Sequence, residues 1–148
     1  MTKNSAAMDN TTEIWKDIPG YEGLYQVSNL GRVKSLERTK NGINGCIKIQ
    51  NEIILKTRNS RGYRRISLGS KASRKDYQVH QLVAKTFIPN AGDRTEINHK
   101  NGNKSDNSIS NLEWCTRSEN CLHMFSSLGI TRKSISKCVA KVSIDGFL

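Results

Sequence analysis

The sequence predicts an α+β fold, in which a small β-rich N-terminal region precedes a strand–loop–strand–helix unit. Two observations lead to this prediction. Short runs of β-branched and aromatic residues, separated by Gly, Pro and Asn turns, recur through residues 13–79. Residues 80–129 instead combine helical spacing of apolar residues with two short strand-like runs. A chain of 148 residues has room for one full domain or two small ones.

Both ends of the chain differ in composition from its centre. Residues 1–12 are polar and lack the apolar core of a secretory signal, so we interpret them as a disordered leader. Residues 130–148 are interpreted as a linker followed by a strand-like element that starts near Ser136. The sequence therefore divides into four parts: 1–12, 13–79, 80–129 and 130–148.

The first strands are predicted from turn residues that separate short apolar runs. Pro19-Gly20 predicts a turn, and Leu24 to Val27 a strand. A second turn at Asn29 to Gly31 leads into a strand from Arg32 to Leu36. We expect Tyr25, Val27, Val33 and Leu36 to form a small apolar face.

The chain is strongly basic, with 24 Lys and Arg against 13 Asp and Glu and a formal net charge of +11. Such an excess suits a polyanionic partner, and nucleic acid is the commonest one. An anionic membrane surface would also attract it, but no amphipathic basic helix or long apolar run is found. The four cysteines lack a CxxC pair, which argues against structural zinc or a disulfide framework and favours reduced thiols in an intracellular protein.

The positive charge is concentrated between Glu52 and Asp76, where no acidic residue occurs. Ile53 to Leu55, Tyr63 to Leu68 and Tyr77 to Val79 read as strands, and Arg64 and Ser67 are expected to alternate away from Ile66 and Leu68. A solvated charged face is one interpretation. We favour a phosphate-binding sheet, whose candidate DNA-binding residues are Lys56, Arg58, Arg61, Arg64, Arg65, Lys71, Arg74 and Lys75.

Two helices are predicted in the C-terminal unit. His80 to Phe87 carries apolar residues at helical spacing and is closed by Pro89. Thr116 and Glu119 form a capping box that starts a helix running from Arg117 to Leu128, followed by Gly129. Its inward side chains are expected to be Cys121, Leu122, Phe125 and Leu128.

Between the helices, the sequence predicts a hairpin with a long polar loop. Thr95 to His99 and Leu112 to Cys115 read as the strands, and Lys100 to Ser110 as the loop. This topology brings the end of the first strand near the start of the following helix. Asn98 and Asn120 then offer two amide oxygens to one hard cation such as Mg²⁺, which takes its other ligands from water and phosphate.

His99, at the end of a strand and the start of a polar loop, has the pKa range that suits a general base. Each candidate also has a plainer interpretation. His99 alone is more often a surface or hydrogen-bonding residue, and Asn111 can simply hold the loop. His80 can be a packed or capping residue. His123, three residues after Asn120, is expected on a solvated helix face, with an approach to the metal as the alternative.

Four ordered blocks of this sequence resemble the HNH endonucleases of phages and mobile introns. They are His80 to Pro89, Ile97 to Asn107, Asn111 to Trp114, and Ser118 to Asn120. The segment from Trp15 to Leu36, within residues 13–36, resembles the small motif that often precedes this nuclease domain in homing endonucleases. The chain after residue 130 resembles the start of a truncated C-terminal DNA-binding repeat.

The resemblance implies a ββα-metal active site. It assigns His99 as general base, Asn98 and Asn120 as metal ligands, Asn111 as the residue that fixes the loop and the histidine, and His80 as a supporting residue. Many members carry Asp at the position of Asn98, so this chain keeps the oxygen ligand and lacks its charge. We therefore expect a monomeric endonuclease that nicks or cuts double-stranded DNA with one divalent metal, Mg²⁺ or Mn²⁺, and no other cofactor.

Its expected location is the cytoplasm of a bacterial cell that hosts a phage or mobile element. The alternative is a DNA-binding protein that retains the HNH scaffold with weak or no catalysis. A third option, an RNA-binding protein, is disfavoured because Tyr63 and Tyr77 are the few stacking aromatics near the basic run.

Overall fold

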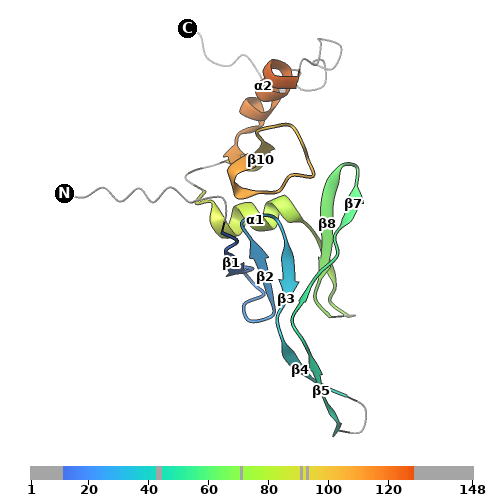
Figure 1. The fold of residues 1–148 in the computed structure, drawn as a ribbon. Helices are drawn as coiled ribbons and strands as arrows, with labels where there is room; N and C mark the ends of the chain where they lie inside the picture. Colours follow the sequence, from blue (N-terminus) through green and yellow to red (C-terminus); the bar gives the residue numbers. More distant parts are fainter. Residues whose placement is uncertain (1–11, 43–44, 71, 91, 93, 129–148) are drawn as a thin grey trace, which may run out of the picture.

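The structure is a computed structural model that describes residues 12–42, 45–70, 72–90, 92 and 94–128. The expectations for residues 1–11 and 129–148, and for Lys71, lie outside the described residues. The described part is mixed, with short antiparallel sheets and two α-helices arranged in an elongated body (Figure 1). The predicted α+β fold is therefore confirmed.

A four-stranded antiparallel sheet forms the N-terminal part, in the order β1-β2-β3-β6. Its strands are β1 (Trp15–Asp17), β2 (Tyr25–Ser28), β3 (Val33–Ser35) and β6 (Ile53–Ile54). β2, β3 and β6 correspond to predicted strands. The expected apolar face is present, since Tyr25, Val27 and Val33 are buried.

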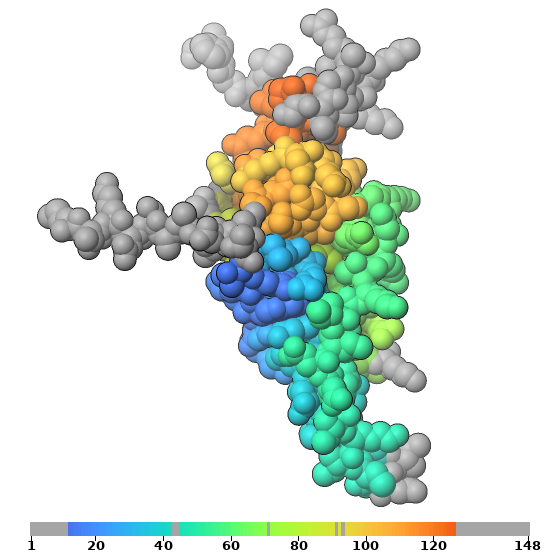
Figure 2. Space-filling model, viewed as in Figure 1, coloured from blue at the N-terminus to red at the C-terminus, as the bar shows by residue number. Residues whose placement is uncertain are grey.

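Two further groups of strands follow along the chain. β4 (Arg38–Asn41) and β5 (Ile47–Gln50) form a separate hairpin that projects from the body (Figures 1 and 2). β7 (Arg58–Ser60), β8 (Tyr63–Leu68) and β9 (Lys75–Gln78) form a three-stranded antiparallel sheet. The tight turn between β7 and β8 has positive φ at Arg61 (54°) and Gly62 (85°), as a two-residue hairpin turn of type I′ requires.

One expectation for β8 was wrong. Arg64 was predicted to alternate away from Ile66 and Leu68, but residues two apart in a strand share a face. Arg65 and Ser67 occupy the face opposite the buried Ile66 and Leu68. Arg64 is nevertheless exposed, because it lies toward the hairpin turn.

Helix α1 (Val79–Phe87) connects the sheet of β7, β8 and β9, called the basic sheet below, to the C-terminal unit. Its buried residues include Val79, Leu82 and Val83, which recur at helical spacing and face one common core. That core also contains Val27 and Val33 from the first sheet, Ile66 and Leu68 from β8, and Leu112 from the C-terminal hairpin. Figure 1 shows α1 lying between the N-terminal strands and the strand β10.

The C-terminal unit follows the predicted order of strand, loop, strand and helix. β10 (Glu96–His99) pairs antiparallel with β11 (Leu112–Cys115), and the short 3₁₀ turn η2 (Ile109–Asn111) closes the loop between them. α2 (Arg117–Leu128) begins at the expected capping box. The Glu119 carboxylate accepts from Thr116 N at 2.8 Å, and the Thr116 hydroxyl accepts from Glu119 N at 3.3 Å.

The expected buried face of α2 is only partly present. Leu122 was predicted to point inward, but its side chain is 67% exposed. Cys121 and Phe125 are half-buried. Among the described elements, α2 packs mainly on β10, so one narrow side of the helix is covered. No helix in the described ranges is long and apolar enough to cross a membrane.

Candidate active site and nucleic-acid interface

The candidate active site lies on the hairpin of β10 and β11 and on the loop that joins them. Asn98 and His99 end β10, and both are buried, each with 6% of its surface exposed. As neighbours in a strand they point to opposite faces of the hairpin. The site is therefore assembled from two sides of β10, with α2 on one side and the polar loop on the other.

The Asn107 side chain determines which ring nitrogen of the neutral His99 carries the hydrogen. Its Oδ1 lies 3.3 Å from His99 Nε2, and its Nδ2 donates to the carbonyl of Ser105 at 3.3 Å. Because that carbonyl can only accept, the amide orientation is set and Oδ1 faces the histidine. His99 Nε2 must then carry the hydrogen, which leaves the lone pair on Nδ1.

Burial lowers the pKa of His99 below its ordinary value, although the hydrogen bond that His99 donates to Asn107 and the charge of Asp106 act in the opposite direction. A lowered pKa keeps the imidazole neutral at physiological pH. A neutral imidazole with its lone pair on a defined atom is the form that accepts a proton from water.

Asn111 holds both ends of the polar loop together. Its Oδ1 accepts from Asn101 N at 2.9 Å, and its Nδ2 donates to the carbonyl of Asp106 at 2.9 Å. Its backbone carbonyl accepts from Lys100 N at 2.9 Å. The loop that presents Asn107 to His99 is thus closed through one buried amide.

The two candidate metal ligands are each anchored by a carboxylate. Asn98 Nδ2 donates to Glu113 Oε1 at 2.9 Å, across the strand pair. Asn120 Nδ2 donates to Glu96 Oε2 at 2.6 Å, which ties α2 to β10. Glu96 and Asn98 are two residues apart on one strand face, about 7 Å from each other.

This donor set fits a hard divalent cation. Since each amide NH₂ is held by a carboxylate, the two amide oxygens, which accept no hydrogen bond from the described residues, are the atoms left for a metal. The two glutamates also add negative charge beside neutral amide ligands. Mg²⁺ and Mn²⁺ prefer such oxygen ligands.

His80 lies beside His99 in the interior, where the two rings are 5.0 Å apart and nearly perpendicular. Burial, together with the nearby His99, lowers the pKa of His80 to about 4. Its Nδ1 is buried and has no hydrogen-bond partner among the described residues. His80 is therefore a packed, uncharged neighbour of the candidate base, as the plainer interpretation held.

The buried His80 predicts a loss of stability in acid. Its pKa is about 4 in the folded protein and 6.5 in the unfolded chain, so the unfolded state binds the proton more readily. The stabilisation is complete above pH 6.5 and is lost as the pH falls toward 4, by up to about 3 kcal/mol. Urea midpoints measured across this range for the native chain and for His80→Gln test it. A variant whose stability falls as steeply as that of the native chain would contradict it.

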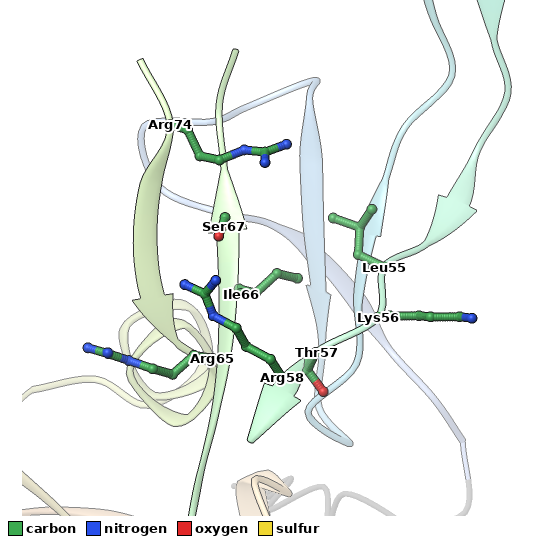
Figure 3. Close-up of a pocket in the computed structure, with 8 residues that line it drawn as sticks. All are labelled: Leu55, Lys56, Thr57, Arg58, Arg65, Ile66, Ser67 and Arg74. Atoms are coloured by element: carbon green, nitrogen blue, oxygen red, sulfur yellow. The ribbon is translucent and has the colours of Figure 1, made fainter. Parts of the chain in front are cut away.

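The basic sheet carries most of the predicted DNA-binding residues at its surface. Six are exposed and Arg65 is half-buried; the exposed ones are Lys56, Arg58, Arg61, Arg64, Arg74 and Lys75. A pocket of about 350 Å³ is lined by Lys56, Arg58, Arg65 and Arg74, together with Leu55, Thr57, Ile66 and Ser67. Figure 3 draws these residues as sticks.

Among the described residues, only part of this charge is neutralised. Arg58 pairs with Asp76, which also accepts from the Ser67 hydroxyl. The Nε atom of Arg65 is buried and finds no partner among the described residues. A buried donor without an acceptor is costly unless a ligand supplies one.

Sequence reasoning missed several residues that arrange this site. Asn107 lay within a recognised block but received no role, and Glu96 and Glu113 were not singled out. Their positions depend on the register that places Glu113 opposite Asn98, and on the loop closure, which a linear pattern does not display.

Comparisons with known proteins give a consistent result. Residues 13–69 match the NUMOD4 motif, and residues 77–122 match an HNH endonuclease family. The DNA endonuclease I-HmuI of Bacillus phage SP01 is 39% identical over 128 residues, which cover 86% of this chain and 66% of that protein. An uncharacterized HNH endonuclease, L247, of Acanthamoeba polyphaga mimivirus is 35% identical over 90% of this chain and 32% of its own length.

A solved structure that describes DNA binding and cleavage by the HNH homing endonuclease I-HmuI matches with a TM-score of 0.59 and 32% identity. The match covers 84% of this chain and 64% of that one. The chain thus spans just under two thirds of the phage relative and about one third of the mimivirus relative.

Proposed function

Because the chain joins a NUMOD4 motif to an HNH endonuclease domain and is homologous to the HNH homing endonuclease I-HmuI, we propose that it is a DNA endonuclease. It hydrolyses phosphodiester bonds of double-stranded DNA, acting as a monomer inside the host cell of a phage or mobile element. The observation that carries the proposal is the buried His99, whose Nε2 faces an acceptor so that Nδ1 is left as the base.

In this proposal His99 Nδ1 removes a proton from the water that attacks the scissile phosphate. Asn111 keeps the loop closed, so that Asn107 stays within hydrogen-bond distance of His99 Nε2. A general base in a defined orientation accelerates such a step by about 10²–10⁴-fold.

Asn98 and Asn120 would hold the divalent metal through their amide oxygens, with Glu113 and Glu96 orienting the amides. When bound, Mg²⁺ or Mn²⁺ supplies positive charge that stabilises the leaving oxygen and the phosphate. Neutral amide ligands would bind a free divalent metal weakly, so we expect the metal to bind more tightly when DNA is present.

The basic sheet binds the DNA backbone in this proposal, with the pocket at Arg65 taking a phosphate. Each cation that neutralises one phosphate contributes a slope of about −0.9 to the dependence of log affinity on log salt. We expect Arg65→Ala and Arg74→Ala each to weaken DNA binding. Each should also reduce the magnitude of that slope by about 0.9, the contribution of one phosphate contact. Binding titrations from low to high salt measure it, with Lys16→Ala, whose ammonium lies over the Phe87 ring, as a control. An unchanged slope would show that the pocket residues do not contact DNA phosphates.

Cleavage of supercoiled plasmid is the direct test of the function. The purified chain is incubated with a plasmid library and Mg²⁺ or Mn²⁺, with EDTA in a parallel reaction, and the product ends are sequenced. We expect metal-dependent nicked or linear DNA with defined ends. Salt-sensitive binding without any metal-dependent product would instead identify a non-catalytic DNA-binding protein.

A further inference from the structure

An aromatic side chain from the basic sheet reaches the candidate base. Tyr63 is the first residue of β8, directly after the β7–β8 turn. Its ring lies 5.3 Å from the ring of His80 and 6.2 Å from that of His99. The three rings form one cluster, although Tyr63 lies within the NUMOD4 match and both histidines lie within the HNH match.

The same turn also contacts the polar loop. The Ser105 hydroxyl donates to the carbonyl of Gly62 at 3.1 Å. The Lys104 ammonium lies 4.9 Å from the centre of the Tyr63 ring, at cation–π distance. Tyr63 therefore touches both His99 and the loop that carries Asn107.

His99 needs such a contact, because its hydrogen bonding alone holds the ring weakly. Its bond to Asn107 is 3.3 Å long, at the outer edge of normal geometry. The neighbouring His80 is itself held by packing, since its Nδ1 has no partner among the described residues. The plane of the His99 ring thus depends on the aromatic surfaces around it.

We propose that Tyr63 is a positioning residue of the nuclease, which holds the His99 ring so that Nδ1 faces the site. This inference rests on the proposed function, and it assigns the N-terminal region a part in the active site besides DNA binding. We attribute this role to the aromatic ring of Tyr63, because the described residues provide no hydrogen bond to its hydroxyl. Tyr63→Phe therefore retains the function and Tyr63→Ala loses it.

The kinetic test compares single-turnover cleavage at saturating DNA with DNA affinity measured without a catalytic metal. Tyr63→Ala is expected to lower the cleavage rate by on the order of 10²-fold, as misplacement of a reacting group does, and to leave the affinity unchanged. Tyr63→Phe is expected to cleave like the native chain. Tyr63→Leu keeps apolar volume without a planar ring and replaces the alanine variant if that one unfolds.

Tyr21→Ala is the matched control, since it removes a tyrosine ring that packs on Tyr25 and Tyr77, away from the histidines. It accounts for losses that come from general destabilisation. A Tyr63→Ala or Tyr63→Leu protein that cleaves at the native rate, or that loses only DNA affinity, overturns the proposal. A loss of cleavage no larger than that of Tyr21→Ala also overturns it.

A second readout does not require cleavage. Histidine ¹⁵N spectra above the ordinary pKa of histidine report which ring nitrogen of His99 carries the hydrogen. We expect the native chain and Tyr63→Phe to show the Nε2–H form, and Tyr63→Ala to show a mixture. The same single form in all variants overturns the positioning role. If the native chain does not cleave DNA at all, the proposed function fails, while the spectra still decide the role of Tyr63.

Discussion

Replacing His99 by alanine is expected to lower the rate of DNA cleavage by about 10²–10⁴-fold, which is the contribution of a positioned general base. The affinity for duplex DNA should stay the same, because His99 is buried and the cations that would contact phosphate lie on a different sheet. Single-turnover cleavage and salt-matched binding assays measure the two quantities separately.

His123→Ala is the histidine control for this experiment. His123 is half-buried on α2, three residues after Asn120. We expect its removal to leave cleavage intact. If His123→Ala were inactive and His99→Ala active, the base would have been assigned to the wrong histidine. Equal activity of both variants with the native chain would exclude both His99 and His123 as the base.

Removing the carboxylate of Glu113 is expected to weaken metal binding by about 10–100-fold, the usual effect of losing a group that orients a ligand. In Glu113→Ala the Asn98 amide loses its acceptor, so it can turn its NH₂ toward the metal position. The negative charge beside this neutral ligand is lost as well. Cleavage therefore needs a higher Mn²⁺ concentration.

Titration of Mn²⁺ against cleavage rate, and Mn²⁺ binding measured by electron paramagnetic resonance in the presence of DNA, test this effect. Glu113→Gln is the matched variant, since its amide oxygen still accepts from Asn98 while the charge is gone. A large effect of Ala with a small effect of Gln would assign the role to orientation. Unchanged metal dependence in both variants would show that Glu113 does not support the metal site.

The regular elements could be predicted where burial imposes a pattern on the sequence. β8 and α2 were predicted with the bounds that they have, and α1 began one residue earlier than expected. The hairpin of β4 and β5 was missed. Its residues are almost all exposed, including Ile47 and Ile49, so neither face shows the alternation that marks a half-buried strand.

The candidate site was predictable in its main residues and not in its supporting ones. His99, Asn98, Asn111 and Asn120 were named from an ordered motif. Asn107, Glu96 and Glu113 come into contact with them only through loop closure, strand register and helix docking. Leu122 was wrongly expected inside, because helical spacing does not reveal how little of α2 is covered.

The turn between β2 and β3 approaches the polar loop very closely. At Gly31, where φ is +79°, a Cβ atom would lie 2.8 Å from the Cβ of Asn107 and 3.0 Å from its carbonyl oxygen. Ile109 N also donates to the carbonyl of Asn29 at 2.8 Å. Asn107, the hydrogen-bond partner of His99, thus packs against the turn of the N-terminal motif.

This close contact limits how the N-terminal motif can be exchanged between related proteins. An N-terminal region grafted from another protein would have to bring a glycine at this turn, or it would displace Asn107 and with it His99, the proposed general base. Exchange of the N-terminal region between related proteins should therefore succeed only when the incoming region has a glycine at this turn, or when the polar loop is transferred with it.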